Sequence, residues 1–293
     1  MERQQRARVS RARLGKLAAF TGRKLTQTLV TLLIILTLTF IVFYAIPGDP
    51  ARIMLGTTAD SARVAALEAE LGLDRPLHEQ IAGYMGGLLR GDLGTSIRFD
   101  RPVAGLLASR VQLTLALALE ALLICLLIGV PLAILSARRP GGVLDQVIAV
   151  IVETWLAIPP FFMGIILTLL LGVLFRQFDG VTYIAPQLSI AGFWRSLLVP
   201  ALAIALPRTA WVVQFLRQAL VDESSRDYVR TAVGKGLSRS QIVRRHLIRN
   251  ALVPLITTLG IILAELIAGA IIIEQVFNLP GLGRLLVTAI EAR

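Results

Sequence analysis

The chain has 293 residues, of which 55% are hydrophobic and 17% are charged, and its mean hydropathy is +0.73. A soluble domain carries about 25% charged residues, so this composition excludes an ordinary cytosolic enzyme and predicts an all-α polytopic membrane protein. The net charge is +11. Eight of the basic residues lie in the first 24 positions, and eight more lie between Arg217 and Asn250. This placement is typical of residues that set membrane topology, so we expect no nucleic-acid partner.

The first third of the chain predicts a tail, a membrane span and a polar segment. Residues 1–24 form a basic tail, and the charge-free residues 25–48 are long enough to cross a bilayer core that needs about 20 residues. A cleaved signal peptide has a shorter apolar core, so we expect an uncleaved first span with a cytoplasmic N-terminus. Residues 49–108 have balanced charge and predict an extracytoplasmic segment with two short helices, near Ser61–Leu71 and Leu77–Leu89.

Residues 109–293 predict the rest of the membrane core. The apolar runs in it indicate four further spans, at residues 111–137, 147–175, 197–216 and 251–276. Pro159 and Pro160 interrupt the second of these runs and predict a break there. A basic turn at residues 138–142 is expected on the cytoplasmic side.

Four charged residues lie in or near the predicted spans: Glu120, Glu153, Arg208 and Glu265. A charge at the centre of a span costs about 2.5–3.5 kcal/mol on insertion scales, so such residues usually face a polar interior. One interpretation is that the three carboxylates line a translocation path and meet an amino group or a cation of the substrate. The other is that the charges pair with one another, as Arg208 with Glu265, or lie near the headgroups.

The sequence contains no pattern that predicts a catalytic site, a metal site or a cofactor. Cys125 is the only cysteine, and the two histidines, His78 and His246, are far apart in the sequence. The pair Gly234–Lys235 superficially resembles a phosphate-binding loop, but that fingerprint needs a glycine five positions earlier, where Val229 stands. We therefore expect this chain to hydrolyse no ATP itself.

The run from Asp222 to Pro254 is the longest polar run between apolar segments in the second half of the chain, and it predicts a helix, a break and a second helix. The first helix is expected over Asp222–Lys235 and to end at Gly236. Its apolar residues are expected on one face: Tyr228, Val229, Ala232 and Val233. Ser238–Gln241 form a capping box that begins the second helix. Such a loop contacts a partner protein or lies on anionic headgroups.

Several separate stretches resemble one family of transport proteins. They are Pro47-Gly-Asp-Pro-Ala-Arg52, Leu71-Gly-Leu-Asp-Arg-Pro76, Leu89-Arg-Gly-Asp-Leu-Gly94, the run from Asp227 to Pro254, and Glu274-Gln-Val-Phe-Asn-Leu-Pro-Gly-Leu-Gly-Arg284. Together they resemble the permeases of ABC importers of the dipeptide, oligopeptide and nickel type. The run from Asp227 is similar to the EAA loop of these permeases. Of the general Glu-Ala-Ala pattern, which maps onto Arg230, Thr231 and Ala232, only Ala232 matches, together with Gly236.

The resemblance implies a type I ABC importer fold with six spans, of which five are visible, so we expect the sixth after Arg293. It implies a permease of the first-subunit type in an ATP-driven, binding-protein-dependent importer of di- or oligopeptides, or of nickel or another small solute. Its implied partners are a second homologous permease in a heterodimer, two ABC ATPase subunits and an extracytoplasmic solute-binding protein, in a bacterial or archaeal plasma membrane.

In this resemblance the cytoplasmic EAA loop, residues 222–250, docks on the ATPase. The residues expected at the contact are Tyr228, Arg230, Thr231, Ala232, Gly234, Lys235 and Gly236. Gln214 stands where these permeases often have Arg, and Glu265 stands where they usually have a small residue, which leaves the substrate open.

Two other functions fit parts of the sequence. A secondary transporter driven by protons would use Glu120, Glu153 or Glu265, but it needs no ATPase-docking loop, and no inverted repeat is evident. A membrane enzyme is disfavoured because no nucleophile and base are patterned together.

Overall fold

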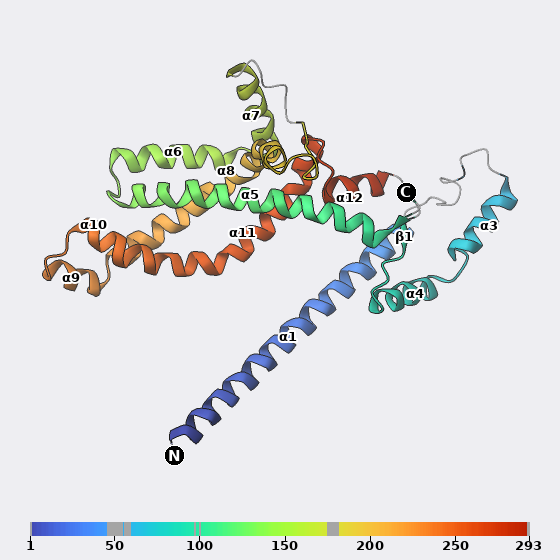
Figure 1. The fold of residues 1–293 in the computed structure, drawn as a ribbon, viewed down its shortest axis with the longest axis horizontal. Coiled ribbons are helices and arrows are strands. Elements are labelled where there is room, and N and C mark those ends of the chain that lie inside the picture. Colours follow the sequence, from blue (N-terminus) through green and yellow to red (C-terminus); the bar gives the residue numbers. More distant parts are fainter. Residues whose placement is uncertain are drawn as a thin grey trace. The chain divides into compact units, whose positions relative to one another are not determined.

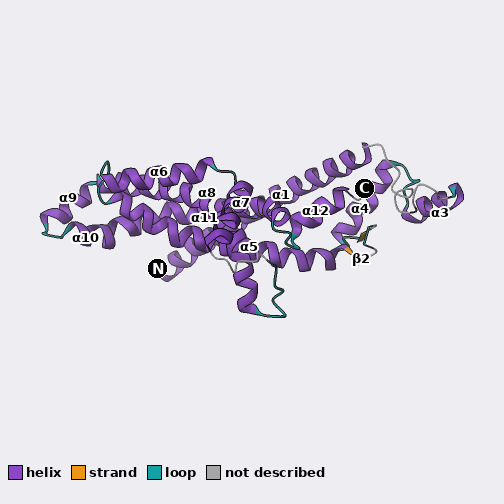
Figure 2. Ribbon diagram, turned by 90° about the horizontal axis from the view of Figure 1, so that it is seen from above, coloured by secondary structure: helices purple, strands orange, loops and turns teal. Residues whose placement is uncertain are grey.

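The computed structural model describes residues 2–45, 55, 60–96, 98–99, 101–174 and 182–291. Over these ranges the chain is helical apart from turns and one short pair of strands, which confirms the predicted all-α class (Figures 1 and 2). Two compact units divide it: residues 1–102 with 292–293, called unit 1, and residues 103–291, called unit 2.

Unit 1 contains one long helix and several short elements. They are α1 (Glu2–Ala45), α3 (Ser61–Leu71), α4 (Leu77–Leu89) and the antiparallel strands β1 (Thr95–Ser96) and β2 (Arg101–Pro102). Residues 19–42 of α1 are long and apolar enough to cross a membrane; the end of the predicted span, residues 46–48, lies outside the described residues, as does the motif at 47–52. The two short helices predicted in the polar segment are confirmed.

Unit 2 contains the remaining elements. They are α5 (Val103–Ala137), α6 (Val143–Ala157), α7 (Pro160–Leu174), α8 (Ile190–Ser224), α9 (Asp227–Gly234), α10 (Arg239–Ile242), the π-helical turn η1 (Val243–Leu247), α11 (Ile248–Val276) and α12 (Leu282–Glu291). Three helices here are long and apolar enough to span a membrane: α5, α8 and the continuous helix from Ser240 to Val276.

The span predicted at residues 147–175 is a broken pair of helices. Its two halves, α6 and α7, meet at an angle of 111°, and counting the pair as one span gives five candidate spans in the part of the chain that the structure describes. The break has a local cause. Ile158 is held in an extended conformation because it precedes a proline, and Pro160 begins the next helix, where its missing N–H costs nothing.

Helix α8 is the centre of unit 2, and it packs against α5, α6, α7 and α11. Four alanines of α8 with no exposed surface let the neighbouring helices approach closely: Ala201, Ala203, Ala205 and Ala210. On α5, a Cβ added to Gly129 would lie 3.0 Å from a methyl carbon of Val212, so a larger residue there would require Val212 to shift. The helix continues through Pro200 and Pro207, both of which are buried.

The two ends of unit 2 differ. In both views, α9 and α10 lie together at one end of the group formed by α5, α8 and α11, and α12 lies toward the other (Figures 1 and 2). We call these the α9 end and the α12 end. Between them, one face of α5 exposes leucines spaced four residues apart: Leu115, Leu119, Leu123 and Leu127. An apolar stripe of this kind faces lipid or another helix in a membrane.

Candidate functional site

The loop of residues 222–250 begins differently from the prediction. Helix α8 runs to Ser224, and Arg226 is extended, so α9 starts only at Asp227. The predicted single helix over Asp222–Lys235 is therefore wrong at its beginning. The break has a side-chain cause, because the hydroxyl of Ser225 donates to the carbonyl of Asp222 at 2.7 Å and competes with helix continuation.

The end of α9 is confirmed at the predicted glycine. The N–H of Leu237 donates to the carbonyl of Ala232 at 3.2 Å, and the N–H of Gly236 donates to that of Val233 at 2.9 Å. This is the Schellman pattern, and Gly236 adopts the positive φ of +79° that it requires. The chain therefore reverses at a fixed elbow.

The predicted capping box is confirmed as well. The N–H of Gln241 donates to Oγ of Ser238 at 3.4 Å, and the N–H of Ser238 donates to Oε1 of Gln241 at 2.9 Å. The helix that starts here does not stop near Pro254, because α10, η1 and α11 follow one another without a break. The second helix of the loop and the last predicted span are therefore one helix.

The inner side of α9 is fixed to the two long helices. Ala232 is buried, and Tyr228 packs against the same apolar core. The amide of Asn250 on α11 donates to Tyr228 Oη and to Glu223 Oε1 on α8, both at 3.3 Å. Burial raises the pKa of the Tyr228 phenol above its ordinary value, so the hydroxyl stays protonated at neutral pH. Tyr228 and Ala232 thus hold the short helix in place.

The outer side of α9 is open to solvent. Five of the seven predicted contact residues are exposed: Arg230, Thr231, Gly234, Lys235 and Gly236. Val233, which the sequence placed on the apolar inner face, is instead 60% exposed. It lies in the last turn of an eight-residue helix, beyond the residues that meet the core. Helical periodicity over only eight residues cannot predict that Val233, between Arg230 and Lys235 in the sequence, faces outward.

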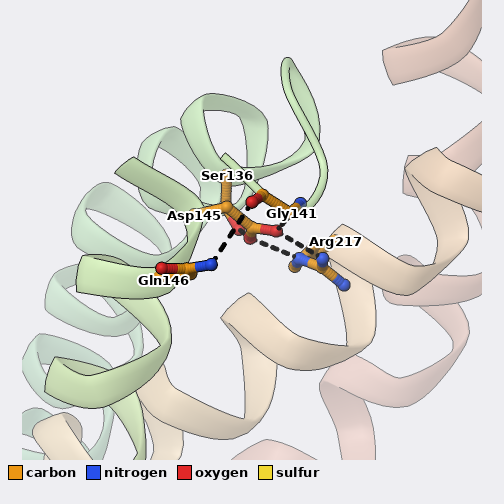
Figure 3. A network of polar contacts seen from close by, with 5 residues as sticks. All are labelled: Ser136, Gly141, Asp145, Gln146 and Arg217. Carbon is orange, nitrogen blue, oxygen red and sulfur yellow. Dashed lines mark hydrogen bonds and ion pairs between the residues drawn. The ribbon is translucent and has the colours of Figure 1, made fainter. Parts of the chain in front are cut away.

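A second polar cluster near the α9 end was not predicted. The carboxylate of Asp145, on α6, is 6% exposed. It accepts from Nε of Arg217 at 2.7 Å, from Nη2 of Arg217 at 2.6 Å, from the N–H of Gly141 at 2.7 Å and from the hydroxyl of Ser136. Figure 3 shows that these groups come from the end of α5, the α5–α6 turn and α8. The only sequence signal is an acidic residue in the first turn of an apolar helix.

Of the charges inside the predicted spans, two form a pair. Nη1 of Arg208 lies 2.8 Å from Oε2 of Glu265, with side-chain exposures of 38% and 45%. Glu153 is exposed, and Oε2 of Glu120 is buried without a hydrogen-bond partner among the described residues. The structure therefore bears out the pairing of Arg208 with Glu265. Within the described ranges no three His, Cys, Asp or Glu side chains gather in a way that could hold a metal.

A third polar cluster lies at the α12 end, where α11 turns into α12. Glu274 is completely buried, and its carboxylate accepts from the hydroxyl of Thr114 at 2.5 Å and from the N–H of Gly283 at 2.6 Å. A Cβ on Gly281 would lie 2.1 Å from this carboxylate. The motif at residues 274–284 is thus a turn folded around its own first side chain and bonded to α5.

These features define a class of protein. Long apolar helices joined by a fixed polar loop make a multi-pass membrane component. Residues 129–293 match the family described as binding-protein-dependent transport system inner membrane component, and residues 17–118 match the N-terminal family of the same membrane components. The chain belongs to this family and is a permease subunit of a binding-protein-dependent importer in the plasma membrane.

Relatives agree over most of the chain. A putative peptide transport system permease protein of Brucella suis biovar 1 (strain 1330) is 34% identical over 277 residues, which cover 94% of this chain and 88% of the relative. The glutathione transport system permease protein GsiC of Salmonella choleraesuis (strain SC-B67) is 35% identical over 271 residues, 92% of this chain and 86% of the relative. Permeases of this family work with a solute-binding protein and with an ATPase that is a separate subunit.

Proposed function

We propose that this permease imports di- or oligopeptides and is driven by ATPase subunits that dock on loop 222–250. Peptide substrates are supported by the relatives, one described as a peptide transport permease and another as a glutathione transport permease, since glutathione is itself a small peptide. The observation that carries the docking role is the construction of α9. It is a short helix with a fixed inner side, an open outer side and no catalytic group of its own.

The loop has the mechanical properties that coupling requires. At its beginning it continues from α8, and at its end it continues into α11. Asn250 on α11 donates to Glu223 on α8 and to Tyr228 on α9. A displacement of α9 is therefore passed to two long helices of the membrane core. A flexible loop would absorb the same displacement, so the elbow at Gly236 and the capping box at Ser238 favour transmission.

The outer face of α9 indicates the chemistry of the docking groove. Arg230 and Lys235 are exposed cations, and the exposed Val233 lies between them in sequence. Arg230 is only loosely paired, with Nη1 3.8 Å from Asp227 Oδ1, both side chains being more than 80% exposed. A groove with an apolar floor and an acidic rim complements this face.

The membrane arrangement follows from the same proposal. The basic tail, the turn at residues 138–142 and loop 222–250 lie in the cytoplasm, because Lys and Arg in short loops stay there. A second homologous permease completes a heterodimer, and the exposed leucine stripe of α5 is available to it or to lipid. ATP hydrolysis takes place in the docked subunits.

The translocation path is assigned to the helices that carry Glu120, Glu153 and Glu265. One oxygen of Glu120 is buried and has no hydrogen-bond partner among the residues that the structure describes, and such an atom is costly unless it meets water or a ligand, which supports this assignment. Glu265 stays a candidate although it pairs with Arg208. Uptake that is unchanged in both Glu120→Gln and Glu265→Gln, with normal assembly, would contradict the assignment.

Docking is tested by purifying the complete importer with Val233→Asp in this chain. Because Val233 is largely exposed, the variant folds, but its carboxylate enters the docking groove, and we expect ATPase subunits to be lost from the complex. The matched control is Ser240→Asp, which adds the same charge at an exposed position just after the elbow and keeps the ATPase. Retention of the ATPase and of uptake in Val233→Asp would overturn the docking role.

The substrate is tested separately by uptake into vesicles that contain both permeases, the ATPases and the cognate binding protein. Radiolabelled di- and tripeptides and radiolabelled nickel are supplied in parallel, with ATP inside. Peptide uptake that depends on ATP supports the proposal. ATP-dependent uptake of nickel without peptide uptake would replace the substrate and leave the docking role intact.

A further inference from the structure

A pocket of about 380 Å³ lies at the α12 end of unit 2. It is lined by Ser109, Arg110, Gln112, Leu113, Ala116, Tyr183, Pro186, Gln187, Phe193 and Pro280. These residues come from the first half of α5, the segment before α8, the start of α8 and the turn between α11 and α12. Its volume lies within the range of about 300–1,000 Å³ that small-molecule sites occupy.

The pocket and loop 222–250 are at opposite ends of the same helices. The pocket uses residues 109–116 of α5, and the Asp145 cluster receives Ser136 from the other end of that helix. At a rise of 1.5 Å per residue, 20 residues of helix separate the two by roughly 30 Å. The pocket is therefore too far from α9 to contact a subunit docked there. With loop 222–250 in the cytoplasm, as proposed above, the pocket belongs to the extracytoplasmic end, where a binding protein delivers substrate.

The described lining of the pocket carries one positive charge. Among the lining residues that the structure describes, Arg110 is the only charged one, and none is acidic. One guanidinium nitrogen, Nη1, donates to the carbonyl of Pro280 at 2.9 Å, and within the described ranges the guanidinium makes no ion pair. The carboxylate of Glu274 lies close enough to Arg110 for their charges to interact, but it is completely buried, it accepts from Thr114 and Gly283, and it does not line the pocket.

The other lining residues fit a carboxylate ligand with an apolar body. Gln112 and Gln187 bring side-chain amide donors to the same lining as Arg110, and Leu113 and Phe193 supply an apolar wall. Arginine binds carboxylates through two parallel hydrogen bonds, and added amide donors strengthen that contact. Burial raises the pKa of the Tyr183 phenol, and the charge of Arg110 partly offsets this, which agrees with the two groups being close.

From this arrangement we propose that the pocket receives the C-terminal carboxylate of an incoming peptide, with Arg110 as its principal ligand. The inference rests on the proposed peptide function. A concave site of this volume favours a small molecule over an acidic side chain of the binding protein, which would need only a charge on an open surface.

The position of the pocket gives binding a route to the rest of the permease. Arg110 holds Pro280, which lies in the turn at the end of α11. α10, η1 and α11 form one continuous helix from Ser240 to Val276. The turn follows one end of this helix, and the elbow of loop 222–250 precedes the other. A carboxylate bound at Arg110 therefore contacts the turn that ends this helix, at the opposite end from α9.

The test uses the complete importer in vesicles and one peptide in two forms, with a free C-terminal carboxylate and with a C-terminal amide. In Gln187→Glu, a negative charge enters the pocket while the bond from Arg110 to Pro280 stays. We expect the ratio of acid uptake to amide uptake to fall about tenfold from its wild-type value, because the new carboxylate in the lining repels the carboxylate of the peptide. The neutral variant, Gln187→Met, removes one amide donor without adding a charge and should lower the ratio much less than Gln187→Glu does. The same binding protein is used in every assay, so its own preference for the acid or the amide affects all the variants equally.

Two further variants separate ligand binding from structure. Arg110→Gln removes the charge and is expected to lower the ratio, and Arg110→Lys restores part of it. Thr114→Val loosens the turn without changing the charge of the pocket and is expected to reduce uptake of both peptides equally.

The outcomes are distinct. An equal loss of both peptides in Gln187→Glu overturns the inference, and so does a loss of binding-protein docking that is independent of the peptide. If the wild-type importer takes up neither peptide, the proposed peptide function itself fails. If it takes up both and Gln187→Glu keeps the wild-type ratio, only the pocket is wrong.

Discussion

The two ends of unit 2 are each held by a buried carboxylate, but in different ways. At the α9 end, Asp145 is 6% exposed and forms a bidentate ion pair with Arg217. At the α12 end, Glu274 has no exposed surface and accepts hydrogen bonds from the neutral groups of Thr114 and Gly283. Each fastens a turn to a neighbouring long helix.

The difference shows what each end depends on. The ion pair at Asp145 depends on charge, because each partner would be left with an uncompensated charge if the other were removed. The site of Glu274 depends on shape, because Gly281 leaves room for the carboxylate and Gly283 lets the donating turn lie close to the backbone of Ile271. We therefore expect the α12 end to be sensitive to added volume and the α9 end to be sensitive to lost charge.

The largest effect is expected for Gly283→Ala at the α12 end. A Cβ there would lie 2.4 Å from the Cα of Ile271, and backbone cannot move aside as a flexible side chain can. We expect little folded protein, measured as the monodisperse fraction in size-exclusion chromatography after detergent extraction. Gly260→Ala lies on α11, the helix that carries Ile271, and an added Cβ there meets nothing within 4 Å. It is the matched control and should fold normally. Equal yields of the two variants would contradict the packing argument.

The second effect is expected at the α9 end, in a double-mutant cycle of Asp145→Asn and Arg217→Met. Removing one partner of a buried pair costs about 3–5 kcal/mol, and the 31% exposure of Arg217 puts the expected cost near the lower value of about 3 kcal/mol. The double variant should recover part of the loss, as judged by denaturation midpoints of the purified complex. If the two losses simply add, the pair contributes no coupling and the comparison with Glu274 fails.

A smaller loss is expected for Glu274→Gln, which makes the direct comparison with Asp145→Asn. The amide keeps the size of the side chain but replaces one acceptor oxygen with a donor facing Thr114 or Gly283. An unmet hydrogen bond of this kind costs about 1–3 kcal/mol, and the two groups that donate to this carboxylate are neutral. Measured by the same denaturation midpoints, a loss larger than that of Asp145→Asn would show that charge matters more at the α12 end.

The parts of this molecule that the sequence predicts correctly are those with local causes. The short helices at 61–71 and 77–89, the break before Pro160, the stop at Gly236 and the capping box at Ser238 all arise from residues that act within one or two turns. The family resemblance and the pairing of Arg208 with Glu265, one of two interpretations of those charges, were also confirmed.

The parts that it misses depend on contacts between distant residues. Asp145 and Arg217 are 72 positions apart, and Thr114 and Glu274 are 160 positions apart, so no local pattern brings them together. The break at Ser225 and the outward position of Val233 were missed for a related reason. Helical periodicity continues smoothly through both, and only the packing of Tyr228 and Ala232 on the core decides where α9 begins and which side is open.

The smallest effect is expected at the elbow between α9 and α10, in the pair Gly236→Ala and Gly234→Ala. Gly236 has φ of +79° and nothing within 4 Å of an added Cβ, so its alanine variant meets only backbone strain of about 1 kcal/mol. Gly234 is helical and equally open, so alanine there should stabilise α9 by about 0.5–1 kcal/mol. Hydrogen exchange of the α9 amides separates the two, faster in Gly236→Ala and slower in Gly234→Ala. Because the strain is confined to a short exposed helix, the stability of the membrane core should not change. If only Gly236→Ala binds the ATPase more weakly, the angle of the elbow sets the docking geometry, rather than the side chains of the loop.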